Sequence, residues 1–332
     1  MKIAILIPDN TVREMFIPDT ARRALEAVGT LTWNEKAWEP ENLAALLADA
    51  EVCITGWGCP SLDESIIKDA KNLKLVAHTG GSAAGIYSPY LYDKGVRVIS
   101  GNLLFAESVA EGTLAYMLAG QRRIPQYSKR TEKGEWNDRL KMPTNAVMDK
   151  KVSLIGFGAI ARFLVPMLKP LRAVIKVYDP YISDELCREY GVTRVSILEE
   201  AFTGADIISL HLAQQPETFH LINKDLIDLI PDGALLVNTS RGSVIDEAAL
   251  AEALKTGRFR AVLDVYEKEP LPMDSPLRGL PNVTIIPHQA GPTTDQFCHI
   301  TITLAEEIKN FQAGKPMRME ISKEYAAKMT TM

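Results

Sequence analysis

The sequence has little of several features that would assign its 332 residues to a specialised class of protein. Its first apolar run, Ile3 to Ile7, is only five residues long, and no run approaches the roughly 18 residues that a membrane-spanning helix needs. The four cysteines form no C-x-x-C pair and no cluster with histidine, which indicates reduced thiols and no metal site. We therefore expect a cytoplasmic protein without a secretory leader, membrane span or disulfide framework.

Positive charge is not in excess either. The formal net charge of −5 argues against a general affinity for nucleic acid or anionic membranes. No internal repeat or low-complexity segment is evident. The composition, 46% hydrophobic and 24% charged, is that of an ordinary globular protein. The length suits about two domains of 100–200 residues each.

The first hundred residues alternate apolar runs with amphipathic stretches. This alternation predicts a parallel sheet covered by helices on both faces. We expect strands over residues 2–7, 31–33, 51–55, 73–78 and 96–99, and helices over residues 19–28, 40–50, 62–68 and 89–94.

Two of these predicted strands end in unusual glycine-containing segments. The first is Gly56-Trp57-Gly58, in which Trp57 is either a pocket wall or an ordinary surface aromatic. The second, Gly80-Gly81-Ser82, follows His78 and Thr79, and its successive N–H groups could cradle a small anion such as a carboxylate. A plain tight turn is the alternative. His78 is open between packing and substrate contact.

A long helix is predicted over residues 107–124, followed by a polar, basic tract over residues 121–141 that contains Trp136. That tract is predicted to be an exposed arm, either a solvated loop or a segment that grips a second subunit. A second alternation starts at residue 151 and predicts another doubly wound sheet. Its strands are expected at 151–155, 173–178, 193–195, 205–210, 234–238, 260–264 and 283–286, with helices at 224–229 and 247–256, and a final helix at 293–312.

A glycine-rich turn follows the first strand of this second sheet. Gly156 permits a tight turn, Gly158 lets a pyrophosphate approach the backbone, and Ala161 lets helix and strand pack. The helix that follows directs its free N–H groups toward the phosphates. Asp179 ends the next strand, 21 residues past Gly158, where this fold places the acid that binds the adenosine ribose. A carboxylate there would repel a 2′-phosphate, so NAD is favoured over NADP.

Three later strands end in side chains with complementary chemistry. Arg241 could bind a carboxylate bidentately. Glu267 and Glu269 are candidate partners for His288, and a histidine paired with a carboxylate moves protons near neutral pH. With a nicotinamide as the hydride carrier, these are the groups needed to oxidise a 2-hydroxy acid or to reduce a 2-oxo acid.

The sequence resembles the D-isomer-specific 2-hydroxyacid dehydrogenase family over nearly its whole length. The resemblance rests on Gly156-Phe157-Gly158-Ala159-Ile160-Ala161, Asp179-Pro180, Ser209-Leu210-His211-Leu212 with Pro216-Glu217-Thr218, Asn238-Thr239-Ser240-Arg241-Gly242, Leu263-Asp264-Val265-Tyr266 with Glu269-Pro270, and Pro287-His288. It implies a Rossmann NAD domain, residues 104–290, inserted into a discontinuous flavodoxin-like substrate domain, residues 1–103 and 291–332. It also implies a homodimer, with the dimerisation arm at about 121–150.

Roles for individual residues follow from the same resemblance. Arg241 would bind and polarise the substrate, and His288 would be the general acid/base with Glu269, the acid directly before the proline, as its partner. The remaining implied contacts are to the substrate from Trp57, Gly80, Gly81 and Ser82, and to the cofactor from Gly156, Gly158, Ala159, Ile160, Asp179, His211, Thr239, Asp264 and Gly291.

The expected activity is NAD-dependent reduction of a small 2-oxo acid such as glyoxylate or hydroxypyruvate. Two alternatives stay open: a dehydrogenase of another small oxyanion such as phosphite, and an NAD-sensing protein like the transcriptional corepressors that share this fold. The run Ala84-Gly85-Ile86-Tyr87 after the glycine loop departs from the family pattern, which leaves the substrate open. Steady-state assays with a panel of 2-oxo acids would distinguish these alternatives.

Overall fold

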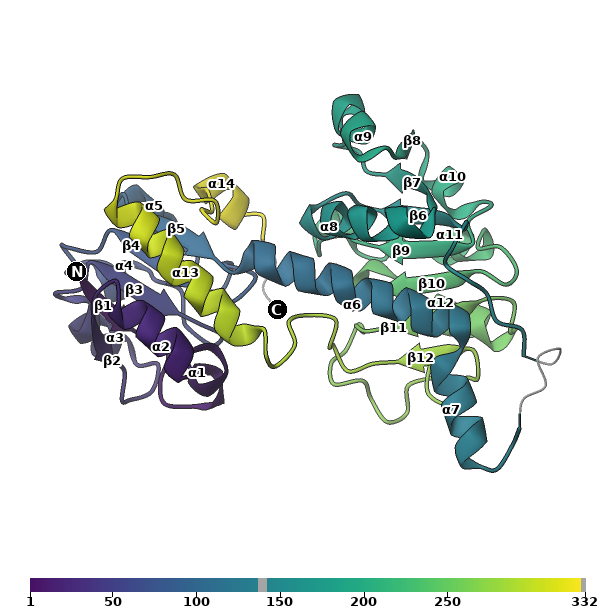
Figure 1. Ribbon diagram of the computed structural model, residues 1–332, viewed down its shortest axis with the longest axis horizontal. Coiled ribbons are helices and arrows are strands. Elements are labelled where there is room, and N and C mark those ends of the chain that lie inside the picture. The colour runs from purple at the N-terminus through teal and green to yellow at the C-terminus, as the bar shows by residue number, and fades with distance from the viewer. Residues whose placement is uncertain (137–141, 330–332) are drawn as a thin grey trace. The chain divides into compact units, whose positions relative to one another are not determined.

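The computed structural model describes residues 1–136 and 142–329, and it confirms the predicted fold class of two doubly wound parallel sheets. The chain divides into two compact units, with boundaries at Phe105–Ala106 and Gly291–Pro292. Unit 1 consists of Met1–Phe105 and Pro292–Met332, and unit 2, Ala106–Gly291, is inserted between those two segments (Figure 1). Within the described part of the chain, no helix is both long and apolar enough to cross a bilayer.

Unit 1 is built on a five-stranded parallel sheet with the order β2-β1-β3-β4-β5. Each central strand is a short run of fully buried residues, as expected for a sheet covered on both faces. The order corresponds to the flavodoxin-like arrangement, which binds ligands at the carboxyl ends of its strands. The strands are β1 (Lys2–Ile5), β2 (Thr30–Trp33), β3 (Val52–Thr55), β4 (Leu75–His78) and β5 (Arg97–Ser100).

Alternate side chains of these strands enter two separate cores. Ile3 and Ile5 pack under α2 and α13, which lie side by side in Figure 1, while Ala4 packs with the helices of the opposite face. The strand period of two therefore divides each strand between both layers. The helices are α1 (Thr11–Phe16), α2 (Asp19–Glu26), α3 (Pro40–Leu47), α4 (Glu64–Ile67), α5 (Pro89–Asp93), α13 (Phe297–Gln312) and α14 (Lys323–Ala326).

Unit 2 contains a seven-stranded parallel sheet with the order β12-β11-β10-β9-β6-β7-β8. From β6 the chain first adds β7 and β8 on one side of the sheet and then β9 to β12 on the other side. The order of the strands therefore reverses between β6 and β9, which pair in parallel from Val152–Ile207 to Ile155–Leu210. That reversal is the switch point at which dinucleotide-binding sheets hold their ligand. The strands are β6 (Lys151–Ile155), β7 (Val174–Tyr178), β8 (Thr193–Val195), β9 (Ile207–Leu210), β10 (Leu235–Asn238), β11 (Arg260–Leu263) and β12 (Val283–Ile285).

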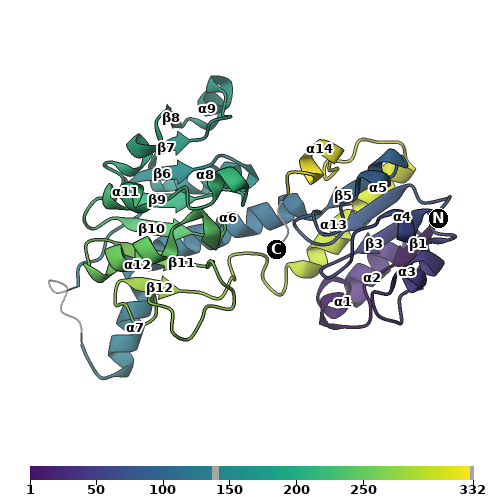
Figure 2. The ribbon, with the colours of Figure 1, turned by 180° about the vertical axis from the view of Figure 1, so that it is seen from behind.

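Helices cover both faces of this sheet. Ala110 and Met117 of α6 share one core with α8, and apolar side chains of α11 and α12 belong to the other core. Figure 2 shows the ribbons of α11 and α12 from behind. The Asp246 side chain accepts the N–H of Ala249 and so caps α12. The helices are α6 (Asn102–Arg122), α7 (Ile124–Glu132), α8 (Ala159–Leu168), α9 (Asp184–Tyr190), α10 (Leu198–Phe202), α11 (Lys224–Asp228) and α12 (Glu247–Lys255).

The structure differs from three predictions about these elements. The helix predicted to start at residue 107 begins at Asn102, whose N–H bonds to the Ser100 hydroxyl. The tract predicted as an exposed arm contains the helix Ile124–Glu132 and not a loop over those residues, but α7 buries none of them, so that part is exposed as predicted; residues 137–141 of the tract lie outside the described residues. The last long helix starts at Phe297, four residues later than predicted, because Thr293 and Asp295 bond to each other in the preceding turn.

Candidate active site

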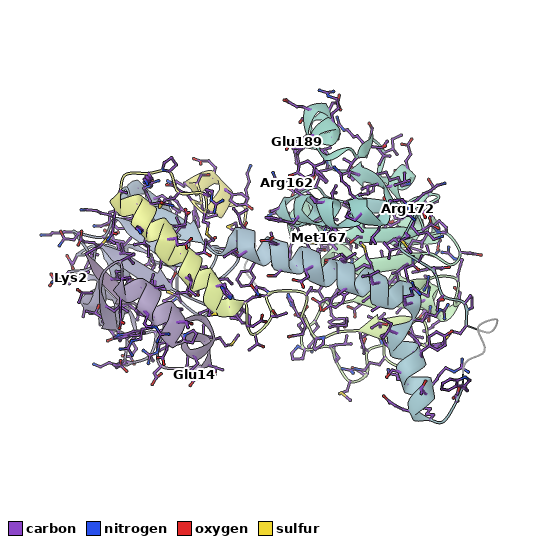
Figure 3. The ribbon with its side chains drawn as sticks, viewed as in Figure 1. Lys2, Glu14, Arg162, Met167, Arg172 and Glu189 are labelled. Carbon is purple, nitrogen blue, oxygen red and sulfur yellow. The ribbon has the colours of Figure 1, made fainter. Side chains whose placement is uncertain are left out.

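The glycine turn after β6 has the geometry that a dinucleotide requires. Gly156 adopts a φ of 94°, and a Cβ there would lie 2.6 Å from the carbonyl oxygen of His211, so only glycine fits. A Cβ on Gly158 would meet nothing within 4 Å, which leaves open space where α8 begins. The free N–H groups of a ten-residue helix start there, at Ala159 and Ile160. Figure 3 shows Arg162 on the same helix.

The Asp179 carboxylate lies at this turn. One oxygen accepts the N–H of Phe157 at 2.7 Å, and the other accepts the N–H of Tyr181 at 2.8 Å. These bonds place a negative charge beside the glycine turn, where the sequence predicted it. The turn, the helix terminus and the acid therefore fit a dinucleotide with unmodified ribose hydroxyls.

His211 forms the other side of the switch point. Its N–H donates to the carbonyl of Ile155 at 2.7 Å, and its Nε2 pairs with the Ser209 hydroxyl at 3.0 Å. Desolvation lowers the pKa of His211 to about 4, so the ring is neutral at physiological pH. Its Nδ1 is buried without a partner among the described residues. This arrangement fits His211 as a neutral residue that lines the cofactor site better than it fits His211 as a proton donor.

Arg241 projects from the loop that follows β10. Asn238 holds that loop, because its amide donates to the Arg241 carbonyl and accepts from Ser240. The guanidinium donates to the Ser240 carbonyl at 2.7 Å, yet its Nε is buried without a described partner. Burial lowers the pKa of Arg241, and the charge of Glu269 opposes that shift. The side chain thus keeps unused donor capacity for a carboxylate or carbonyl oxygen.

The structure brings Glu269 and His288 into direct contact. Glu269 Oε2 lies 2.8 Å from His288 Nδ1, so Nε2 is the ring atom left for another partner. Glu267 instead pairs with His220 at 2.7 Å. The structure therefore distinguishes the two acids that residue types and spacing gave as candidate partners of His288. His288 has a φ of 53°, a left-handed conformation that is costly for a residue with a side chain and is found mostly at functional sites.

Asp264 organises the segment that carries His288. Its buried carboxylate accepts the N–H groups of Gln289 and Ala290, at 2.7 and 2.9 Å, and the hydroxyl of Tyr116 at 3.1 Å. A carboxylate offers about four acceptor positions, so one is left for a nicotinamide carboxamide. Thr239, the residue after β10, is buried, and its hydroxyl lies 2.8 Å from the hydroxyl of Thr113.

Two contributors to this arrangement were missed from the sequence. Tyr116 lies on α6, far along the chain from any motif. Tyr266 donates its backbone N–H to Glu269, and its hydroxyl lies 2.9 Å from the carbonyl oxygens of Leu263 and Ile286. Tyr266 ends the motif Leu263-Asp264-Val265-Tyr266, but that motif assigned it no role, and no pattern marks Tyr116.

The remaining predicted site residues lie in unit 1 or at its boundary. His78 is buried and bonds to the Thr55 hydroxyl at 2.9 Å, so it is a packing residue at the start of the glycine loop. Gly80 is buried, and Gly81 and Ser82 are partly exposed. Trp57 packs edge-on against Phe16 at 5.1 Å. Gly291 ends unit 2, and a Cβ there would meet nothing within 4 Å.

Comparison with known proteins gives a family for this arrangement. Residues 114–290 match the family described as D-isomer specific 2-hydroxyacid dehydrogenase, NAD binding domain. The D-3-phosphoglycerate dehydrogenase of Methanocaldococcus jannaschii is 36% identical over 276 residues, which are 83% of this chain and 52% of that protein. That of Archaeoglobus fulgidus is 34% identical over 265 residues, 79% of this chain and 49% of that protein. The chain thus spans about half the length of these curated relatives.

Solved structures resemble the whole chain. A phosphoglycerate oxidoreductase from Rhizobium etli is 25% identical, with a TM-score of 0.81 over 97% of this chain and 99% of that one. D-lactate dehydrogenase with NAD⁺ from Lactobacillus jensenii, 22% identical, shares the fold with a TM-score of 0.81 over 97% of this chain and all of that one.

Proposed function

The chain belongs to the D-isomer-specific 2-hydroxyacid dehydrogenase family, with residues 114–290 as its NAD-binding domain, and we propose that it reduces a small 2-oxo acid with NADH. The observation that carries this proposal is the set of side chains after β10, β11 and β12. There Glu269 is hydrogen-bonded to His288, and the negative charge of Glu269 raises the pKa of Arg241. One cation to anchor an acid and one proton carrier are what the reaction needs.

Arg241 is the proposed anchor of the substrate. Its guanidinium presents planar donors that match the two oxygens of a carboxylate. The buried Nε without a partner supports this role, because an unpaired buried donor is costly unless a ligand satisfies it. The same positive charge stabilises negative charge that develops on the keto oxygen during reduction.

His288 is the proposed proton donor. Glu269 occupies Nδ1, which fixes the ring orientation and directs Nε2 toward the substrate. In the reducing direction protonated His288 gives its Nε2 proton to the keto oxygen, and in the oxidising direction the neutral ring removes the hydroxyl proton. A bound nicotinamide supplies or accepts the hydride in these two directions.

NAD is the proposed physiological cofactor rather than NADP. The carboxylate of Asp179, already fixed at the glycine turn by Phe157, would accept hydrogen bonds from ribose hydroxyls. It would repel the 2′-phosphate of NADP in the same position. Gly156, Gly158 and the first residues of α8 leave room for the pyrophosphate.

Two substrate classes compete. Arg241 alone suits a short acid such as glyoxylate or hydroxypyruvate, which is the class that the sequence predicted. The names of the relatives at 34% and 36% identity favour 3-phosphoglycerate as the second candidate. We propose the unphosphorylated class, because the one guanidinium of Arg241 matches one carboxylate, whereas a phosphate group on the substrate would need a further cation.

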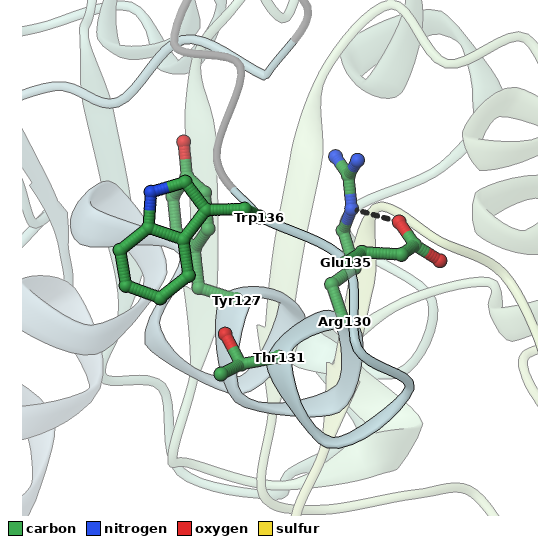
Figure 4. Close-up of a pocket in the computed structure, with 5 residues that line it drawn as sticks. All are labelled: Tyr127, Arg130, Thr131, Glu135 and Trp136. Carbon is green, nitrogen blue, oxygen red and sulfur yellow. Dashed lines mark hydrogen bonds and ion pairs between the residues drawn. The ribbon is translucent and has the colours of Figure 1, made fainter.

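We also propose that the protein works as a homodimer through the surface of α7. Trp136 is 87% exposed and lines a surface hollow together with Tyr127 and Thr131, and exposed apolar side chains that are grouped in this way can mark a protein interface. Figure 4 shows Trp136 beside Tyr127 and Thr131, next to the ion pair of Arg130 with Glu135. An aromatic platform with a charged rim is typical of a protein interface.

The proposed activity is tested by steady-state oxidation of NADH and NADPH with a panel of 2-oxo acids. We expect turnover with NADH, and a loss of about 10²-fold or more in kcat/KM for His288→Ala, the usual size of a general acid contribution. The exposed His299 provides the matched control, since His299→Ala removes a histidine outside the site. Near-normal turnover by His288→Ala would refute the assignment, and an inactive native protein that binds NADH would indicate a sensor.

A further inference from the structure

His220 is bonded to two loops of unit 2 that carry groups of the proposed active site. Its backbone N–H donates to the Ser243 carbonyl at 2.8 Å, and its Nε2 lies 2.7 Å from Glu267 Oε1. Ser243 follows Arg241 by two residues, and Glu267 precedes Glu269 by two residues. A residue that belongs to neither loop therefore joins the loop of the substrate anchor to the loop of the histidine's partner.

The position of the His220 ring is fixed from its own side. The N–H of Ile222 donates to the Val244 carbonyl at 3.0 Å, so the segment around His220 runs beside the loop that follows β10. His220 has a φ of 49°, a left-handed conformation that histidine adopts more readily than most residues with a side chain. The Phe219 ring stacks on the imidazole at 4.0 Å between ring centres. The imidazole is thus oriented by its neighbours for its contact with Glu267.

Glu267 faces a second carboxylate, that of Glu247, the first residue of α12. Each of these two acids accepts the backbone N–H of the other at 3.0 Å. Burial raises the pKa of Glu247, the N–H of Glu267 opposes that shift, and the charge of Glu267 adds to it. Two carboxylates that face each other repel, and the imidazole N–H of His220 is a side-chain donor that offsets the repulsion. Without His220 we expect Glu267 to turn away from Glu247.

The two loops also touch each other directly. A Cβ on Gly242 would lie 2.3 Å from the backbone nitrogen of Glu267, so the backbones meet at a distance that only glycine allows. Arg241 is the neighbour of Gly242 in the chain. A shift of the Glu267 backbone would therefore reach Arg241 through this contact and Glu269 through the chain.

We infer, on the premise of the proposed function, that His220 is a positioning residue for the reaction. Its side chain holds the loop that carries Glu269, and its backbone holds the loop that carries Arg241. The bond from His220 to Glu267 thus keeps the substrate anchor and the proton-carrying pair in their relative places. His220 acts through Glu267 and needs no contact with the substrate. A displacement of about 1 Å at such groups reduces turnover by up to about 10²-fold.

The test compares two substitutions of His220 in the full chain, with NADH and hydroxypyruvate as substrates. His220→Asn suits the left-handed backbone but is too short to reach Glu267, and we expect kcat to fall about tenfold. The Kd for NADH, measured by fluorescence titration, should stay within about twofold of the native value. His220→Gln places an amide N–H near the position of Nε2, and kcat should stay within about threefold of native. A purely structural role would not predict that the longer amide restores kcat.

Arg172 provides the matched control. It also has a left-handed backbone, with a φ of 55°, and its side chain also bonds to a carboxylate, that of Asp149, at 2.8 Å. The two residues precede β7 and β6 and so lie at the amino ends of these strands, away from the proposed site. Arg172→Asn should therefore leave kcat within about twofold of native.

The outcomes separate this inference from the proposed function. The inference is wrong if His220→Asn keeps kcat within about twofold of native, if His220→Gln is as slow as His220→Asn, or if Arg172→Asn is equally slow. In each of these cases a loss of turnover in His288→Ala still supports the dehydrogenase activity. If the native protein turns over no 2-oxo acid with either cofactor, the proposed function falls, and the inference falls with it.

Discussion

Removing the hydroxyl of Tyr266 should impair catalysis although this group touches neither substrate nor cofactor in the proposed mechanism. The hydroxyl lies 2.9 Å from the carbonyl oxygens of Leu263 and Ile286 and accepts the N–H of Ile286 at 2.9 Å. It therefore joins the end of β11 to the residue after β12. Glu269 follows the first of these strands and His288 follows the second, so the bridge fixes how the acid and the imidazole meet.

Tyr266 is also tied to the segment that carries Arg241. A Cβ on Gly242 would lie 1.8 Å from the carbonyl carbon of Tyr266, so the two backbones are as close as glycine permits. The Tyr266 N–H donates to Glu269 Oε1 at 3.1 Å. Burial raises the pKa of Tyr266 to about 12, so the hydroxyl stays protonated wherever the enzyme is assayed. Tyr266→Phe leaves the backbone contacts in place and removes only the bridge.

The magnitude follows from the bonds that are lost. The Leu263 carbonyl and the Ile286 N–H still bond to each other at 2.9 Å, and the Ile286 carbonyl still accepts the N–H of His288 at 3.1 Å. The substitution therefore removes a hydrogen bond without leaving these groups unpaired. That costs about 0.5–1.5 kcal/mol, or a fall of roughly 2–4 °C in Tm for 1 kcal/mol. A shift of about 1 Å between His288 and its partner groups reduces turnover by up to about 10²-fold. We expect kcat to fall at least about tenfold, with the KM for NADH unchanged.

The assay measures kcat, both KM values and Tm for Tyr266→Phe and for a matched control. Tyr92→Phe serves as that control, because the Tyr92 hydroxyl also donates to a backbone carbonyl, that of Ile321, at 3.3 Å. It lies on α5, outside the proposed catalytic set and the proposed interface. If Tyr266→Phe lowers Tm but keeps kcat within about twofold of native, the bridge is only structural and the reasoning fails.

Two further predictions concern stability and assembly. The pKa of His78 is about 4 when folded and 6.5 as its reference value, so the unfolded chain binds the extra proton between these values. The contribution of His78 to the free energy of unfolding should be fully present above pH 6.5 and fall as the pH drops, by about 2 kcal/mol at pH 5. Urea midpoints measured at pH 7 and pH 5 should therefore show a smaller loss of stability in His78→Gln than in the native protein. Trp136→Ala should shift sedimentation equilibrium toward the monomer, whereas Tyr181→Ala, which alters an equally exposed aromatic, should not; a dimer unaffected by Trp136→Ala would place the interface elsewhere.

The sequence predicted those parts of the fold in which one short segment contains all the relevant information. Buried strands such as Val52–Thr55 and Leu235–Asn238 are continuous apolar runs between turn residues, so their periodicity and length identify them. The turn at Gly156 was equally predictable, because its positive φ and its contact with His211 demand glycine at a fixed distance from the strand.

Features that depend on tertiary packing were not predictable in this way. Helix α7 has a polar sequence and buries no residue, and the residue before it, Arg123, adopts a left-handed conformation without a side-chain cap. Neither periodicity nor a capping residue therefore indicates this helix in the sequence. Residue types and spacing alone did not choose between Glu267 and Glu269; the family resemblance chose Glu269, and in the structure Glu269 contacts His288 while Glu267 pairs with His220. Tyr116 bonds to Asp264 across 148 positions of sequence, and a contact at that separation leaves no local pattern.

The charges of the proposed groups bear on the substrate as strongly as their positions do. Arg241 contributes one positive charge, and a protonated His288 with an ionised Glu269 adds none. These groups therefore balance one negative charge on the ligand, which is the charge of a simple 2-oxo acid. A phosphorylated acid would bring about two more negative charges and would need a further cation, so the electrostatics favour a small monoanion.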